Sequence, residues 1–144
     1  MESKSKVYLY QTAVRWSEQR KGIISCDGKP DVDVATPPEF KGHEGIWSPE
    51  DLFVASANVC LMTTFLAVAE RAGLDFSAYE STAEGRLELV DGKFRFTAIT
   101  IRPSITLKPG GDTAKAKELI EKAEHNCLIS NSMKPTVTLE PTIR

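Results

Sequence analysis

Cysteine and histidine are scarce in this chain of 144 residues, which has three cysteines and two histidines. Small secreted domains that depend on disulfides are much richer in cysteine, so we expect thiols kept reduced in a cytoplasmic protein. His125 and Cys127 are two residues apart and His43 lies in an expected loop, but no CxxC or HxxxH spacing accompanies them. We therefore expect no metal site.

An excess of basic charge and an apolar leader are also absent. The chain has 18 Lys and Arg residues and 20 Asp and Glu residues, so we expect it to lack the basic surface typical of nucleic-acid-binding domains. Residues 1–11 contain no apolar core of a signal peptide. The uncharged run 52–69 approaches the length of a membrane span, but Ser, Asn and Thr residues dilute it, and we expect no membrane association. The chain length predicts a single domain over residues 1–144.

Alternating residue types predict strands in the first third of the chain. Residues 6–16 alternate in the manner of a β-strand. The turn pair Asp27-Gly28 predicts a hairpin with arms 22–26 and 31–35. Two prolines follow the second arm and end it, because proline cannot donate a hydrogen bond to a sheet.

A helix start at Ser48-Pro49-Glu50-Asp51 is the sharpest local signal. Serine is a favoured N-cap, proline suits the first helical position, and an acid three residues after the cap completes a capping box. The helix is expected to run to Gly73, about 24 residues and roughly 36 Å. Its apolar residues leave no polar face, which is typical of a helix buried on all sides. A single chain of this size can hardly surround such a rod, so we expect a partner chain to cover it.

A second hairpin is predicted after the helix. Residues 81–90 and 93–107 flank Asp91-Gly92, a strong signal for a two-residue turn. Apolar and polar residues alternate along both arms, so one face of this hairpin is expected to be buried.

The last third of the chain predicts helices and a closing strand. Asp112 or Thr113 is expected to cap an amphipathic helix. Asn126 is expected to cap a short helix over 127–133, and a strand is expected over 135–143. Strands, a long helix, a hairpin, helices and a strand together indicate an α+β domain.

The three cysteines differ in their surroundings. Cys60 lies midway along the apolar helix, where a free cysteine often serves as a small hydrophobic residue. Cys127 lies at an expected helix start, where backbone N–H groups favour a thiolate, although a half-exposed structural thiol is the alternative. Cys26 stands beside a turn and is expected to be incidental. A Cys-His hydrolase would need an orienting acid or amide, and nothing in the sequence marks one.

Two segments carry a family resemblance. Residues 48–60 resemble the helix-opening motif of the osmotically inducible protein C and organic hydroperoxide resistance (OsmC/Ohr) family, (S/N)-P-E-(E/Q)-L followed by small residues and a cysteine ten after the glutamate. Residues 126–134 resemble the second motif, C-P-(V/Y)-S, except that Leu128 replaces the proline. The resemblance implies an OsmC-like fold with antiparallel sheets around a long buried central helix, in an intertwined homodimer.

The resemblance also implies roles for individual residues. It makes the protein a thiol peroxidase in which Cys60 is the peroxidatic and Cys127 the resolving cysteine. Arg20 matches the catalytic arginine, with Arg15 as the fallback if the strand is aligned differently, and Glu50 matches the carboxylate that holds it.

Chemistry gives independent support to these roles. Attack on a peroxide needs a thiolate, and a cysteine deep inside a helix is desolvated and beyond the reach of the helix dipole. A guanidinium stays charged in an apolar pocket and can hydrogen-bond the sulfur, so Arg20 suits this task. A buried arginine needs a counter-ion, which Glu50 can supply.

The expected cycle converts Cys60 to a sulfenic acid, joins it to Cys127 as a disulfide, and restores both thiols with an external dithiol, of lipoyl type or a small thiol. Apolar neighbours around Cys60 favour organic hydroperoxides, and the cycle needs no metal, flavin or haem. Two alternatives stay open: an OsmC-like module that binds a small ligand or senses redox state with inert cysteines, and a purely structural dimerisation domain.

Overall fold

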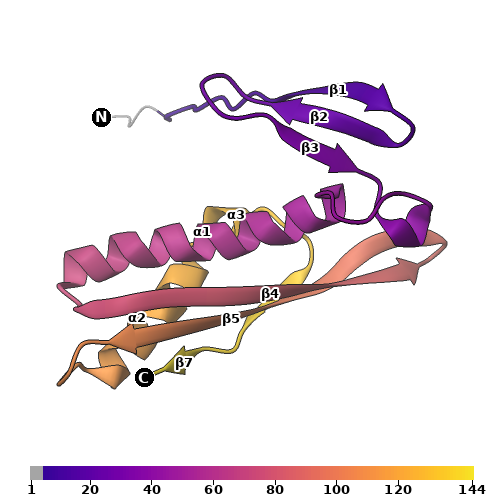
Figure 1. Cartoon of the computed structure of the whole chain (residues 1–144). Helices are drawn as coiled ribbons and strands as arrows, with labels where there is room; N and C mark the ends of the chain where they lie inside the picture. Colours follow the sequence, from indigo (N-terminus) through magenta and orange to yellow (C-terminus); the bar gives the residue numbers. More distant parts are fainter. Residues whose placement is uncertain (1–4) are drawn as a thin grey trace. The chain divides into compact units, whose positions relative to one another are not determined.

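The computed structural model describes residues 5–144, in two compact units, Met1–Leu52 and Phe53–Arg144. Figure 1 labels the elements along the chain. Each unit is built around its own sheet. The expected mixture of helices and strands is confirmed, and each unit is described by itself.

The first unit contains a three-stranded antiparallel sheet of β1 (Ala13–Glu18), β2 (Lys21–Ser25) and β3 (Val32–Ala35), in that order. The hairpin around Asp27-Gly28 is confirmed. The first strand begins at Ala13, later than expected, because Ala13 pairs with Ser25 at the end of β2. The residue directly before Ala13 would lie opposite the turn, where β2 has ended.

Helix α1 (Pro49–Ala72) has the expected start and end. The Ser48 Oγ accepts a 3.1 Å hydrogen bond from the Asp51 backbone N–H, and the Asp51 carboxylate accepts one of 2.9 Å from the Ser48 backbone N–H. This is a reciprocal capping box, with aspartate in the usual place of glutamate. At the other end Gly73 takes a left-handed φ of 68°, which lets the Leu74 N–H reach the Ala69 carbonyl at 3.0 Å.

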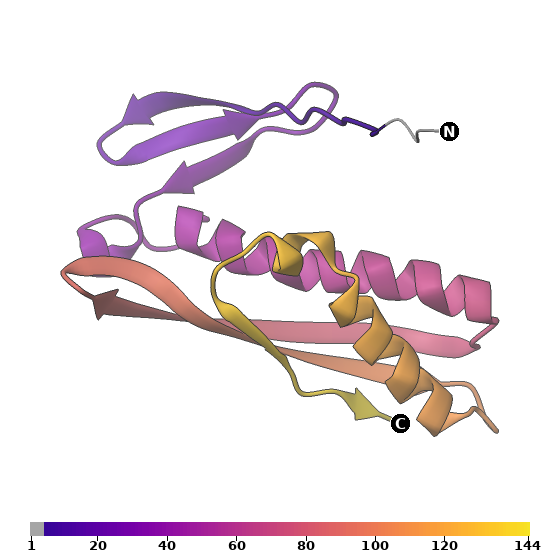
Figure 2. The ribbon, with the colours of Figure 1, turned by 180° about the vertical axis from the view of Figure 1, so that it is seen from behind.

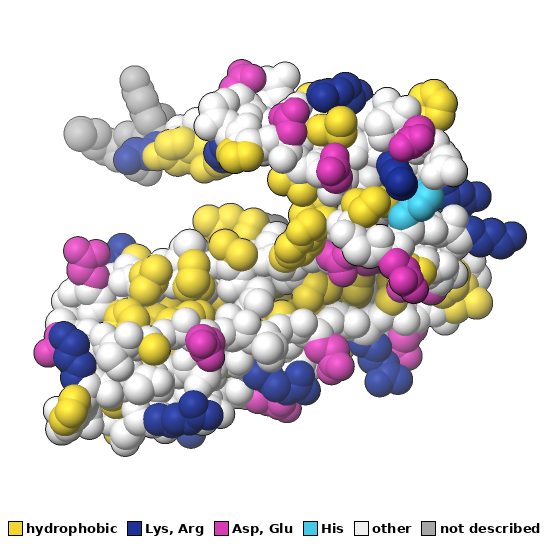
Figure 3. All heavy atoms as spheres, viewed as in Figure 1, with side chains coloured by type: hydrophobic (Ala, Val, Ile, Leu, Met, Phe, Trp, Pro, Cys, Tyr) yellow, Lys and Arg dark blue, Asp and Glu magenta, His cyan; other side chains and the backbone are white. Residues whose placement is uncertain are grey.

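Burial along α1 is one-sided. One stripe of the helix is buried: Ala57, Cys60, Leu61, Phe65, Val68 and Ala69. On another face Val59 and Leu66 are 54% and 41% exposed, and Figure 3 shows apolar side chains gathered over this helix. The expected burial on all sides is therefore not reached within one chain. By length and composition alone α1 could cross a membrane, but its buried stripe belongs to the core of the second unit.

The sheet of the second unit is mixed, not purely antiparallel as expected. The long hairpin of β4 (Phe76–Val90) and β5 (Lys93–Leu107) is antiparallel, with Asp91 and Gly92 at φ 51° and 79° in its turn. The predicted last strand is two short strands, β6 (Thr136–Leu139) and β7 (Thr142–Ile143), and both run parallel to β5. A parallel neighbour needs a crossover, which helices α2 (Thr113–His125) and α3 (Leu128–Asn131) provide.

One hydrophobic core joins this sheet to its helices. In the second half of β5 the odd-numbered residues are buried, and Ile99, Ile101 and Ile105 are fully buried with Phe65 of α1 and Ile120 of α2. Figure 2 shows α2 and α3 from behind. The core therefore holds α1, α2 and β5 as one scaffold.

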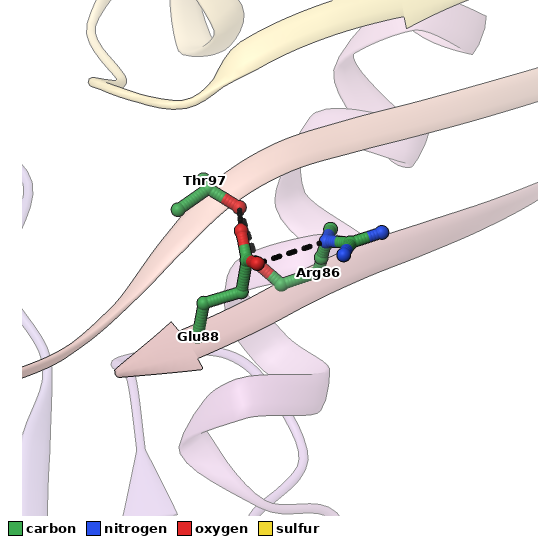
Figure 4. Close-up of polar contacts among 3 residues, drawn as sticks. All are labelled: Arg86, Glu88 and Thr97. Atoms are coloured by element: carbon green, nitrogen blue, oxygen red, sulfur yellow. Dashed lines mark hydrogen bonds and ion pairs between the residues drawn. The ribbon is translucent and has the colours of Figure 1, made fainter. Parts of the chain in front are cut away.

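Polar groups occupy other positions of the hairpin. Arg102 on β5 pairs with Glu140 at 2.9 Å and with Glu84 at 3.7 Å. Near the hairpin tip the Glu88 carboxylate accepts hydrogen bonds from Thr97 and pairs with Arg86 (Figure 4). These contacts, the one from Thr97 first, lower the pKa of Glu88.

Candidate active site

The structure brings together the two cysteines singled out in the sequence. Cys60 lies midway along α1 and is 9% exposed, and Cys127 directly precedes α3 and is fully buried. Both are free thiols. Besides burial, the Cys60 side chain raises the pKa of Cys127, so the two thiols interact and bring together α1 and the start of α3.

Cys60 is held by the helix itself. It lies about 16 Å along α1 from the first helical residue, beyond the first turn where the helix dipole acts. Its Sγ lies 3.8 Å from the Thr64 Oγ1, one turn further along α1. Sequence reasoning missed Thr64, although a hydroxyl four residues from a helical cysteine shares its face and could have been found by spacing.

Cys127 is held between two helices. Its backbone N–H donates to the Glu124 carbonyl at 3.2 Å, and its own carbonyl accepts from the Asn131 N–H at 3.0 Å. Asn126 is the C-cap of α2, and α3 begins only at Leu128 with Cys127 as its N-cap. The expected cap at Asn126 is therefore wrong, because α2 extends up to the residue before it.

The environment of Cys127 favours the protonated thiol. Burial is the main cause that raises its pKa, the hydrogen bond with Cys60 raises it further, and hydrogen bonds with Ser130 lower it. The expected bias toward a thiolate is not found, because burial outweighs the short helix that follows. The alternative of a half-exposed thiol is also wrong, since no part of Cys127 is exposed.

Three further polar side chains lie behind the cysteine pair, and we call Tyr79, Glu124 and Ser130 the buried polar cluster. The nearby Ser130 side chain lowers the pKa of both Cys127 and Glu124. Burial raises the pKa of Glu124. Burial is also the largest cause of the raised pKa of Tyr79, and the charge of Glu124 raises that pKa further. Sequence reasoning missed this cluster. Ser130 stands three residues after Cys127, as the serine of the second motif does, and that spacing was the available signal.

Arg20 and Glu50 both belong to the first unit, and the structure does not pair them. Arg20 is exposed between β1 and β2, and its Nη1 donates to the Phe40 carbonyl at 3.1 Å. Glu50 lies in the first turn of α1, and its buried Oε1 has no hydrogen-bond partner among residues 5–144. Arg15, the fallback arginine, lies 3.8 Å from Asp31.

An apolar hollow of about 370 Å³ lies beside these arginines in the first unit. Its walls combine apolar and basic side chains: Val14, Trp16, Val34, Ala35, Pro49, Arg15, Arg20 and Lys21. Such a lining suits an apolar molecule with an acidic or strongly polar end.

The histidines and Cys26 belong to other elements of the chain than the two thiols. His43 follows the loop after β3, where its backbone N–H donates to the Thr36 carbonyl at 2.9 Å. His125 is the last residue of α2, and Cys26 is half-buried at the end of β2. Within the described part of the chain, no group of three or more His, Cys, Asp or Glu residues could hold a metal ion.

Comparison with known proteins gives a consistent picture. The family model described as OsmC-like protein matches residues 42–142. An uncharacterized protein of Bacillus subtilis, YmaD, is 29% identical over 129 residues, which cover 87% of this chain and 86% of that protein. The protein named Peroxiredoxin OsmC of Escherichia coli is 29% identical over 101 residues, which cover 70% and 69%. Among solved structures, an organic hydroperoxide resistance protein OsmC from Legionella pneumophila is similar, with a TM-score of 0.74 and 26% identity over 95% of this chain and 98% of that chain.

Proposed function

The chain belongs to the family of OsmC-like proteins, and from that membership and its thiol pair we propose that it is a cysteine-based peroxidase that reduces organic hydroperoxides to alcohols. The observation that carries the proposal is the interaction between two buried free thiols, Cys60 and Cys127, which come from distant parts of the chain. Relatives named peroxiredoxin and organic hydroperoxide resistance protein support the same activity.

In the proposed first step the Cys60 thiolate attacks the terminal oxygen of the hydroperoxide. An S–O bond forms, the O–O bond breaks, and the alkoxide leaves as the alcohol after taking a proton. Arg20 is the proposed cation that stabilises the thiolate and the leaving oxygen, and Glu50 its proposed counter-ion. The apolar hollow beside Arg20 supports an organic substrate.

In the proposed second step Cys127 attacks the Cys60 sulfenic acid. The S–S bond forms and the sulfenic oxygen leaves as water. An external dithiol then reduces the disulfide to two thiols and is itself oxidised to a disulfide. The two thiols already interact in the folded chain, so this step needs little rearrangement.

We further propose that the protein works as a homodimer in the cytoplasm. Large apolar side chains are exposed in both units, including Trp16 at 76%, Val59 and Leu66. Exposed apolar patches of this kind mark interaction surfaces, and a second copy of the chain is the proposed cover. Sedimentation of the protein at several concentrations tests this directly: a monomer at all concentrations would contradict it.

The activity is tested by following cumene hydroperoxide consumption with dithiothreitol as reductant. The wild type and Cys26→Ser are expected to turn over equally, because Cys26 lies outside the thiol pair. Cys60→Ser is expected to lose turnover, and Cys127→Ser to complete one turnover and then over-oxidise at Cys60. Equal consumption by the wild type and Cys60→Ser would reject the proposal.

A small-ligand-binding module is the second candidate, and the apolar hollow of the first unit favours it. Trp16 lines this hollow, so a bound fatty acid should change its fluorescence. Tight binding together with thiols that stay reduced in hydroperoxide would favour this candidate over the peroxidase.

A further inference from the structure

The buried polar cluster behind the cysteine pair has no part in the steps described so far. The Tyr79 hydroxyl, the Glu124 Oε2 and the Ser130 Oγ are each buried, and none makes a hydrogen bond of good geometry. A buried polar atom without a partner destabilises a fold. Three such atoms near two thiols are unusual, and a role in the reaction of the thiols would explain why they are kept there.

The backbone sets these groups in line with Cys127. Glu124 lies three residues before Cys127 and shares a hydrogen bond with it, from the Cys127 N–H to the Glu124 carbonyl. Ser130 lies three residues after Cys127, in the turn of α3. The Ser130 hydroxyl interacts with the Cys127 thiol on one side and with the Glu124 carboxyl on the other. The thiol, the hydroxyl and the carboxyl group therefore lie near one another, with Ser130 as the group that interacts with both others.

The resolving step needs such a path. Burial keeps Cys127 a thiol, yet the attacking sulfur must lose its proton as the S–S bond forms. At the same time the sulfenic oxygen of Cys60 leaves as hydroxide and must gain a proton. One proton therefore moves from Cys127 to the departing oxygen, and the products are a disulfide and water.

We propose that Glu124, acting through Ser130, accepts the proton of Cys127 during disulfide formation and returns it to the departing hydroxide. The thiol proton passes to the Ser130 oxygen, and the Ser130 hydroxyl proton passes to the Glu124 carboxylate. Glu124 does not touch the reacting sulfur, so it is a positioning and proton-accepting residue. This inference rests on the proposed peroxidase cycle and adds a residue to its second step.

The acidity of Glu124 suits this task. Burial raises the pKa of Glu124 above the ordinary 4.5, and a stronger base removes a thiol proton more easily. The groups that interact with it are Tyr79 from β4 and Ser130 from α3, with the thiols of Cys127 and Cys60 beyond the serine. The pKa of Tyr79 is raised, so Tyr79 stays neutral and does not compete as a base near neutral pH.

Single-turnover kinetics test the proposal. One equivalent of cumene hydroperoxide is added to reduced protein, and samples quenched over time are analysed by mass spectrometry for the sulfenic acid and the disulfide. In Glu124→Gln we expect sulfenic acid to form at the wild-type rate and the disulfide to form about 100-fold more slowly. Ser130→Ala is expected to slow the same step, and Glu124→Asp to recover part of the rate. Glu121→Gln, on an exposed turn of α2, is the matched control.

The pH profile separates this role from a structural one. The wild-type rate of disulfide formation should rise as Glu124 loses its proton, with a midpoint above the ordinary glutamate range. That rise should be missing in Glu124→Gln and present in Glu121→Gln. Disulfide formation in Glu124→Gln at the wild-type rate and with the wild-type profile would overturn the proposal.

A diamide experiment keeps the test independent of peroxidase activity. Diamide oxidises Cys60 and Cys127 to a disulfide without a hydroperoxide, and Cys127 must again lose its proton. If the wild type forms no sulfenic acid from hydroperoxide, the proposed function fails, while slower diamide-driven disulfide formation in Glu124→Gln than in Glu121→Gln still supports the proton relay. Equal rates in the two variants would overturn it.

Discussion

The two units of this chain differ in how far they bury the apolar residues of their strands. In the second unit, residues 53–144, the alternation along β5 is matched by burial, and Ile99, Ile101 and Ile105 are completely covered. In the first unit β1 also alternates, yet all six of its side chains are exposed. An alternating pattern thus predicts a strand with one apolar face, but it does not predict whether another part of the chain buries that face.

The residues of the candidate active site also come from both units, and they differ in burial. The two thiols lie in the second unit, where both are buried, Cys60 on α1 and Cys127 directly before α3. Arg20 and Glu50 lie in the first unit, where Arg20 is exposed and donates to a backbone carbonyl. The surroundings of the two sulfurs are therefore set by buried side chains of the second unit. The proposed cation, Arg20, instead lies on an exposed part of the first unit.

Among the changes considered, removing a large side chain from the core of the second unit should have the largest effect on the free energy of unfolding. Phe65 is fully buried and its ring lies 5.4 Å from those of both Phe76 and Tyr79. Phe65→Ala is expected to lower the free energy of unfolding by about 3–5 kcal/mol in urea denaturation. Leu89→Ala, on an exposed position of β4, should change it by less than about 0.5 kcal/mol. Similar losses for both would show that the second unit is not packed as described.

Removing the proposed cation of the first unit should act on activity. Arg20→Ala is expected to lower kcat/KM for cumene hydroperoxide about 100-fold, because a positioned donor to a developing oxyanion contributes that much. The unfolding transition should stay unchanged, since Arg20 is exposed. Lys29→Ala, in an exposed turn of the same unit, is the control. A loss found in Arg15→Ala instead of Arg20→Ala would assign the role to the fallback arginine.

A smaller effect is expected where α1 approaches the sheet. A Cβ on Gly85 of β4 would lie 2.5 Å from the Val54 Cγ2 and 2.8 Å from the Phe96 ring. Gly85→Ala is expected to destabilise the protein by about 1–3 kcal/mol through overpacking. Adding Val54→Ala should recover part of this loss in thermal unfolding. A Gly85→Ala protein as stable as the wild type would contradict the close contact.

The pH dependence of stability should show the smallest effect. Burial raises the pKa of Glu124, so the folded state holds this proton more tightly than the unfolded state. The sign follows: stability falls as the pH rises from the ordinary glutamate range through the higher folded pKa. Glu124→Gln has no such proton and should lack this part of the decline in denaturation curves between pH 4 and 8. The same decline in both proteins would show that Glu124 is not responsible.

Sequence reasoning predicted elements whose causes are local. The capping box at Ser48 and the turn at Asp91-Gly92 depend on neighbouring residues, and both are confirmed. The parallel pairing of β6 with β5 was missed, because strand direction depends on the path of the two helices between them.

The candidate site follows the same rule. Cys60 and Cys127 were singled out by motifs, and the family resemblance implied that they pair, whereas their spacing in the sequence could not show that they lie close together. The pKa of Cys127 was expected to move the wrong way because burial cannot be counted from neighbouring residues. Glu124 and Tyr79 were missed for the same reason, since they come from different elements.

Peptide mapping of the oxidised protein tests the central claim most directly. Reduced protein is treated with one equivalent of cumene hydroperoxide, digested without reductant and analysed by mass spectrometry. The account predicts a single disulfide-linked peptide pair that contains Cys60 and Cys127, with Cys26 still free. Thiols that all stay reduced while hydroperoxide persists, or a disulfide that involves Cys26 instead, would contradict it.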